Sequence, residues 1–120
     1  MLDCVALFLQ IKIKLFVFLK HAPFNEDIPN GLVPGKQIFI AGIVGHGDQF
    51  RFDLETRTGG CVFVINPRFH LGQIVRNTDH HGNGAWGPEE KHGPFIFQHG
   101  QPFELIISVD HDRYHVNRFD

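Results

Sequence analysis

The sequence has little cysteine, tryptophan and tyrosine, and it lacks any run of basic residues. Cys4 and Cys61 are its two cysteines, too few for the disulfide framework of a small secreted domain. Reduced thiols are the simpler interpretation, although the sequence also allows a Cys4–Cys61 disulfide. Lysine and arginine are scattered and the net charge is −2, so the basic patch of a nucleic-acid-binding protein is missing. We therefore expect neither a disulfide-stabilised fold nor nucleic acid as a partner.

The sequence also lacks an uninterrupted apolar run long enough to cross a membrane. Residues 2–19 are rich in Leu, Val, Ile and Phe, but four polar residues interrupt them: Asp3, Gln10, Lys12 and Lys14. A membrane-spanning helix needs about 20 mostly apolar residues. The basic start and the small-residue cleavage site of a signal peptide are missing as well. We predict no membrane span and a cytoplasmic location, or an extracellular one reached by secretion without a signal peptide.

A helical period of ten or more residues is absent too, and apolar residues recur mainly at every second position. The thirteen glycines and seven prolines supply turns between short apolar segments. Thirteen phenylalanines are expected to fill much of the core. Short strands separated by turns predict a single all-β domain, an antiparallel β-sandwich or barrel. The predicted strands cover residues 37–44, 49–54, 61–66, 74–77, 94–98, 103–109 and 114–117.

Polar side chains face outward from the predicted strand 61–66 and from the residues just after it. The segment 63–69 reads Phe-Val-Ile-Asn-Pro-Arg-Phe, and side chains alternate across a strand. The phenylalanines and Ile65 then face the core, whereas Val64, Asn66 and Arg68 face away from it. An amide and a guanidinium two residues apart can bind hydroxyl groups. Taken alone, this pair is more simply an exposed polar face.

The single tryptophan ends a polar, glycine-rich loop, and charged residues follow it. Trp86 stands at the end of the loop 77–87, before Glu89 and Lys91. An aromatic ring can stack on the C–H groups of galactose, while amides, carboxylates and cations nearby bind its hydroxyls. By itself, Trp86 could equally cover a small apolar cluster. The loop therefore favours a sugar site only in combination with the strand before it.

Taken together and in order, these motifs resemble the carbohydrate-recognition domain of the galectin family. The resemblance runs from about residue 23 to 116. It implies a galectin-like jelly roll, an antiparallel β-sandwich that binds β-galactosides without catalysis, cofactor or metal. The ligands would be lactose- or N-acetyllactosamine-type glycans on glycoproteins or glycolipids. The motifs are Gly31-Leu32-Val33-Pro34-Gly35, Ile38-x-Ile40-x-Gly42, Asn66-Pro67-Arg68-Phe69, Asn77, Trp86-Gly87-x-Glu89-Glu90-Lys91, Pro94-Phe95 and Gln101-Pro102-Phe103-Glu104.

The resemblance also implies a role for individual side chains. Asn66 and Arg68 would hold the axial O4 of galactose. Asn77 and Glu89 would bind its O6, and Trp86 would stack on the sugar ring. These residues, with Lys91, make up the expected carbohydrate-binding site.

The chain departs from the family pattern at two of these positions. Lys91, which with Glu89 would reach the neighbouring sugar, replaces the usual Arg, and a lysine offers a point charge in place of a planar fork. Val64 stands where the family has His, which removes one partner of galactose O4. One unmade hydrogen bond costs about 1–3 kcal/mol, or roughly 5- to 150-fold in affinity. We therefore expect weak binding, or binding of another glycan.

The two ends of the chain also differ from the family. Residues 1–20 do not resemble it, and the family domain continues with further strands beyond the one that begins at Tyr114. We predict an apolar extension over residues 1–20 and a partial carbohydrate-recognition domain over residues 21–120 that lacks its last strands. Residues 11–19 could add a strand. Open strand edges predict self-association.

Other functions stay open beside galactoside binding. A galectin-like interaction protein with lost sugar affinity is favoured by Val64 and the short C-terminus. A glycoside hydrolase needs two facing carboxyl groups, whereas Glu89 and Glu90 are adjacent and point differently. The histidines, including His80 and His81, could bind a metal, but solvated loop histidines are the simpler interpretation.

Overall fold

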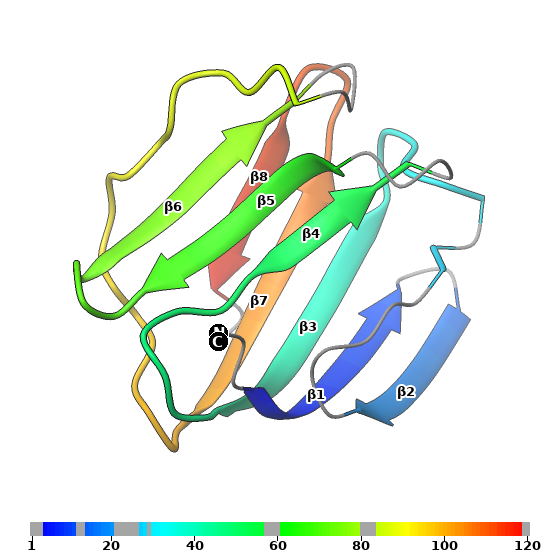
Figure 1. Cartoon of the computed structure of the whole chain (residues 1–120). Helices are drawn as coiled ribbons and strands as arrows, with labels where there is room; N and C mark the ends of the chain where they lie inside the picture. Colours follow the sequence, from blue (N-terminus) through cyan, green and yellow to red (C-terminus); the bar gives the residue numbers. More distant parts are fainter. Residues whose placement is uncertain are drawn as a thin grey trace. The chain divides into compact units, whose positions relative to one another are not determined.

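The chain folds into strands and loops (Figure 1). The computed structural model describes residues 4–11, 14–20, 27–28, 30–56, 61–79 and 84–118, and it places side chains between residues 27 and 117 of these ranges. These ranges contain no helix, and hence none with the length and apolar character needed to cross a membrane. The expected all-β class is confirmed.

The described strands form two antiparallel sheets, and the chain divides into two compact units that each contain one of them. One unit is built from Cys4–His46 and Gln98–Asp120, and its sheet has the order β2-β1-β3-β7-β8. These strands are β1 (Cys4–Ile11), β2 (Lys14–Lys20), β3 (Gln37–Val44), β7 (Pro102–Val109) and β8 (Tyr114–Arg118). The other unit contains Gly47–Phe97, with β4 (Phe52–Glu55), β5 (Cys61–Arg68) and β6 (Gln73–Thr78) in the order β4-β5-β6.

The five-stranded sheet buries alternate residues of β3 and β7, as their period of two predicts. Ile38 lies opposite Ile107, and Ile40 lies opposite Leu105. All four side chains are buried, because paired residues of antiparallel strands point to the same face of the sheet. The predicted apolar face of β7 is confirmed by its buried members, Phe103, Leu105, Ile107 and Val109.

Two N-terminal strands extend this sheet on the other side of β3. β1 pairs with β3, and β2 pairs with β1. The expected added strand over residues 11–19 is confirmed in part, since β2 starts at Lys14. β1 was not predicted, and residues 12 and 13 lie outside the described ranges.

Phenylalanine rings supply much of the core of the three-stranded unit. Phe50 lies with its ring centroid 5.1 Å from that of Phe97 and 5.5 Å from that of Phe52. The expected phenylalanine-rich core is therefore present in this unit. β4 begins at Phe52 and not at residue 49, because Gln49 instead forms an isolated bridge with Arg68 at the end of β5.

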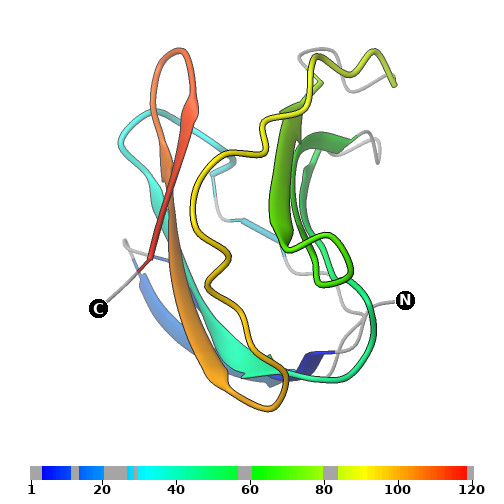
Figure 2. The same cartoon turned by 90° about the vertical axis from the view of Figure 1, so that its left-hand side faces the viewer.

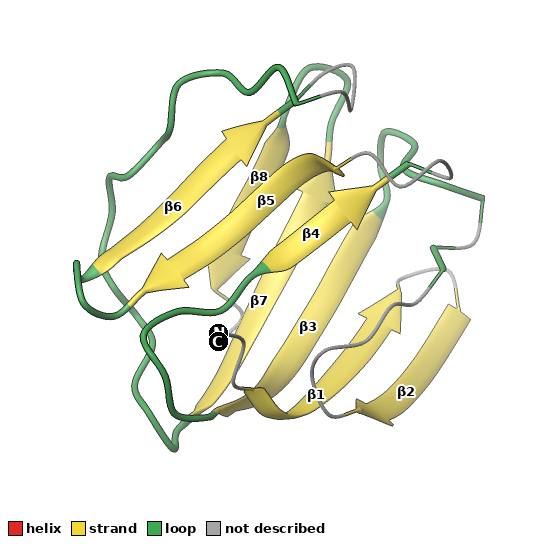
Figure 3. Cartoon of the chain, viewed as in Figure 1, coloured by secondary structure: helices red, strands yellow, loops and turns green. Residues whose placement is uncertain are grey.

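The predicted strand at residues 94–98 is wrong. This segment belongs to the irregular trace that follows β6, drawn in yellow and orange in Figure 2 and as loop in Figure 3. Gly93 has a φ of 109°, outside the range of a strand, and Pro94 has no N–H to donate to a neighbouring strand. The alternating rings still pack, since the centroid of Phe95 lies 5.0 Å from that of Phe69.

Candidate functional site

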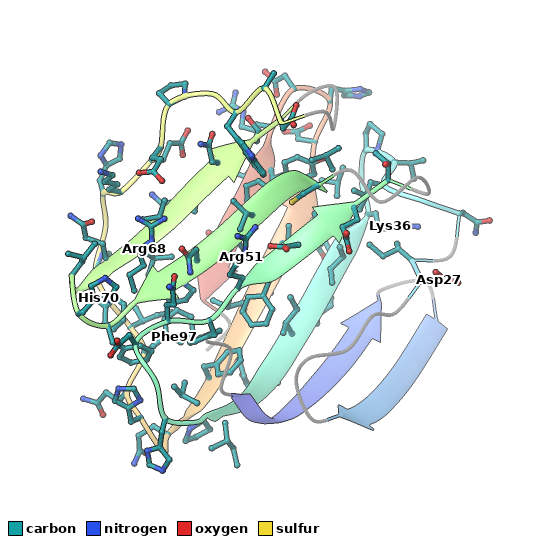
Figure 4. The ribbon with its side chains drawn as sticks, in the orientation of Figure 1. Asp27, Lys36, Arg51, Arg68, His70 and Phe97 are labelled. Carbon is teal, nitrogen blue, oxygen red and sulfur yellow. The ribbon has the colours of Figure 1, made fainter. Side chains whose placement is uncertain are left out.

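The pairing of β5 with β6 gathers polar side chains on one face of the three-stranded sheet. Val64 lies opposite Asn77, and Arg68 lies opposite Gln73. Asn77 therefore joins Val64, Asn66 and Arg68 on the same face. Figure 4 shows Arg68 near the end of β5.

A continuous series of polar contacts starts at Asn66. Arg68 Nε donates to Asn66 Oδ1 at 2.7 Å, and Arg68 Nη2 donates to Glu89 Oε2 at 3.4 Å. Lys91 Nζ lies 3.5 Å from Glu89 Oε1. One carboxylate thus lies between two cations at a part-exposed surface. Ion pairs of this kind contribute little to stability, at most about 1 kcal/mol, so a ligand could replace them at small cost.

Asn77 holds the loop beside Trp86. Its Nδ2 donates to Gly87 O at 2.8 Å, while Gly87 N donates to Thr78 O at 3.1 Å. Trp86, the neighbour of Gly87, is 39% exposed. Its ring is thus accessible to a ligand, which agrees poorly with a side chain that closes an apolar cluster.

The six residues expected to bind carbohydrate therefore lie in one unit, where they form two groups. Four of them form the contact series, and the other two meet at Gly87. The candidate site consists of Asn66, Arg68, Asn77, Trp86, Glu89 and Lys91.

Two expectations about burial in this site are wrong. Val64 is only 8% exposed and Asn66 only 4%, although both lie on the face that was expected to be solvated. β5 is the central strand of its sheet, so Asp53 of β4 and Asn77 of β6 flank Val64 on either side. Asn66 is buried also because its side chain forms hydrogen bonds with Gln49 and Phe50.

Both amide hydrogens of Asn66 are used inside the protein. Asn66 Nδ2 donates to Phe50 O at 2.8 Å and to Gln49 Oε1 at 3.2 Å. A ligand hydroxyl could donate to Asn66 Oδ1, or it could displace Gln49, whose contact is the longer of the two.

Two further residues, Gln49 and Arg76, support the candidate site, and no sequence motif indicated either of them. Gln49 was assigned only to a strand, yet it contacts Asn66. Arg76 Nη2 donates to His92 O at 2.8 Å, which ties β6 to the loop that carries Glu89. No periodicity signals either contact, because each joins residues that only the folded chain brings together.

Cys61 is a free thiol at the start of β5. Burial raises its pKa, and the nearby Asp53 carboxylate raises it further. The side chain of Cys4 lies outside the described part, as do His80 and His81. Among the side chains that the structure does describe, no three potential metal ligands gather.

Known proteins resemble this chain over most of its length. The family described as galactoside-binding lectin matches residues 23–118. Human grifin is 36% identical over 87 residues, which cover 72% of this chain and 59% of grifin. Human galectin-7 is 32% identical over 101 residues, 80% of this chain and 72% of galectin-7. The chain thus spans about three fifths of the length of grifin.

The fold resembles that of a solved structure, chicken galectin 2. The TM-score is 0.64 at 23% identity, over 74% of this chain and 68% of the other. This likeness confirms the expected fold class, the antiparallel β-sandwich of the galectins. The family match over residues 23–118 and the 32% identity with galectin-7 show that the chain belongs to the galactoside-binding lectins, the galectin family.

Proposed function

We propose that the chain binds β-galactosides of the lactose or N-acetyllactosamine type and does not chemically change them. The observation that carries this proposal is the connected series from Asn66 through Arg68 and Glu89 to Lys91, beside an accessible Trp86. The ligands are glycans carried by glycoproteins or glycolipids.

The chemistry of these groups suits a galactose ring. Arg68 presents a planar set of N–H donors to the axial O4, whose hydroxyl hydrogen can be accepted by Asn66 Oδ1. Glu89 and Asn77 offer an acceptor and a donor to O6. The indole of Trp86 can cover the apolar face of the ring, while Lys91 and Glu89 extend toward the next sugar.

Binding without catalysis is supported by the arrangement of the carboxylates. Glu89 contacts Arg68 and Lys91, whereas Glu90 lies 3.9 Å from Arg76 Nε. The two carboxylates pair with different cations. A glycosidase needs them on either side of one glycosidic bond.

Fluorescence of the single tryptophan tests the proposal. Lactose should change the emission of Trp86 and reach saturation, whereas cellobiose, in which O4 is equatorial, should not. Arg68→Ala should abolish the response. Equal responses to both disaccharides, or none in a folded sample, would reject a galactose site at Trp86.

A second function, protein interaction with lost sugar affinity, is favoured by one observation. Val64 places an apolar side chain where the family has His, directly opposite Asn77. Retention on lactosyl resin and release by free lactose would support the first function. A folded chain that passes through the resin would support the second.

A further inference from the structure

The loop that carries Trp86, Glu89 and Lys91 is attached to β6 by its backbone. We name residues 84–92 the recognition loop. Arg76 N donates to Glu90 O at 2.9 Å, and Glu90 N donates to Arg76 O at 2.8 Å. This pair of bonds is an isolated antiparallel bridge, so the loop runs beside β6 at this point without becoming a strand.

The side chain of Arg76 adds a second attachment. Its Nη1 donates to Ile74 O at 2.9 Å, within its own strand, and its Nη2 donates to His92 O at 2.8 Å, at the end of the loop. The guanidinium therefore bridges β6 and the recognition loop through two backbone carbonyls. The side chain is 19% exposed; its bond to Ile74 O is part-buried, whereas its bond to His92 O is exposed.

Arg76 and the candidate site residue Asn77 lie on opposite faces of β6. Asn77 shares the face of Val64, whereas Arg76 lies opposite Ile65 and shares its face. Side chains of the recognition loop also alternate between the two faces where the loop pairs with β6 at Glu90. Glu90 points to the side of Arg76, and Glu89 points to the side of Arg68, as their ion pairs show.

We infer that Arg76 is a positioning residue for carbohydrate binding. Arg76 would not contact the sugar itself. It holds the recognition loop from the face of β6 opposite to Asn77, so that Glu89 lies within reach of Arg68. This inference rests on the proposed function. A lysine at this position could reach one carbonyl but could not bridge two in fixed geometry.

A double-mutant cycle in the full chain tests the inference. Calorimetric titration with lactose should show that Arg76→Gln weakens binding by about 5- to 30-fold, within the range of coupling between interacting sites. In the Glu89→Gln background, the same substitution should weaken binding by less than about twofold. Equal losses in both backgrounds, or no loss in either, would overturn the inference.

Matched variants separate positioning from general destabilisation. Arg76→Lys keeps the charge and most of the side chain but should still weaken binding. Glu90→Gln removes only the 3.9 Å ion pair and should change affinity by less than about twofold, because both carbonyl contacts of Arg76 remain. A loss with Glu90→Gln as large as that with Arg76→Gln would contradict the bridging role.

Hydrogen exchange provides a readout that needs no sugar. Arg76→Gln should speed amide exchange at Glu90 and Gly87 while leaving the amides of β5 unchanged. If the unsubstituted chain binds no lactose, the proposed function fails, and this readout still shows whether Arg76 holds the recognition loop in place. Unchanged exchange at both loop amides would reject positioning by Arg76.

Discussion

At position 64 a small apolar side chain lies between Asp53 and Asn77 in the register of the sheet. Val64→His should raise lactose affinity by roughly 2- to 13-fold, because a new hydrogen bond to galactose O4 contributes about 0.5–1.5 kcal/mol. The substitution enlarges a buried side chain, so it should also lower the free energy of unfolding by about 1–3 kcal/mol. Calorimetric titration and urea unfolding measure the two effects.

The matched control for this substitution is Val64→Leu, which adds bulk but no N–H. It should destabilise the protein without increasing lactose affinity. The gain with Val64→His should also be absent for cellobiose, since the bond depends on an axial O4. An equal gain for both disaccharides would indicate a nonspecific contact.

Cys61 should react slowly with alkylating reagents at pH 8. Its pKa is raised, first by burial and then by the Asp53 carboxylate, so little of the nucleophilic thiolate is present. Iodoacetamide labelling of a Cys4→Ser chain should be slower for the folded than for the unfolded protein. Asp53→Asn should speed the labelling, and no change would show that Asp53 does not act on the thiol.

The raised pKa of Cys61 makes the free energy of unfolding depend on pH in the alkaline range. A raised pKa in the folded state means that the contribution of Cys61 is fully present below its unfolded pKa of about 8.5 and is lost as pH rises through the folded value. Burial raises the pKa of Tyr114 in the same direction. Stability should therefore fall above about pH 8.5, and Cys61→Ser should reduce the fall. An identical fall with and without Cys61 would contradict this contribution.

At the scale of elements, β5 combines a structural and a binding role. Asn66 joins β5 to the segment before β4 through Phe50 O and Gln49 Oε1, and the same side chain accepts from Arg68. The Asn66 side chain therefore connects neighbouring segments of its unit in addition to lying in the candidate binding site.

Asn66→Ala should lower the free energy of unfolding by about 1–3 kcal/mol, because it removes the N–H group that donates a hydrogen bond to the Phe50 carbonyl. Arg68→Ala should cost less than about 1 kcal/mol, since Arg68 and its ion-pair partner Glu89 are both part-exposed. Gln49→Ala is the matched control, for it removes only the 3.2 Å contact. Urea unfolding would contradict this ranking if Asn66→Ala proved the mildest of the three.

At the scale of the whole molecule, open strand edges predict self-association. β2 and β8 are the outer strands of the described five-stranded sheet. An outer strand presents backbone groups that a second copy can pair with. Sedimentation should therefore show a mass that rises with protein concentration.

Asn117→Lys should weaken this association, because two copies of an exposed β8 residue would bring like charges together. Gln98→Lys is the control, since it adds the same charge in a loop. A monomer at all concentrations would reject self-association through strand edges. An equal effect of both lysines would point to net charge as the cause.

The amino-acid sequence determined the local features of this protein. The period of two predicted β3 with the same bounds and the buried face of β7, because side-chain alternation depends only on the strand backbone. The spaced motifs likewise indicated the galectin family. Residues 94–98 do not form the strand that their alternating apolar residues predicted, because Gly93 and Pro94 prevent strand geometry there.

The tertiary structure alone decided which groups share an environment. Burial of Val64 follows from flanking strands that alternation along one strand cannot reveal. The contacts of Asn66 with Gln49, and of Arg76 with His92, join segments 16 or 17 residues apart. Such contacts depend on the conformation of the loops and on the register between strands. A short pattern of apolar and polar residues carries no information about either. The sequence therefore indicated which residues to expect in the candidate site, while the fold determined which contacts hold them in place.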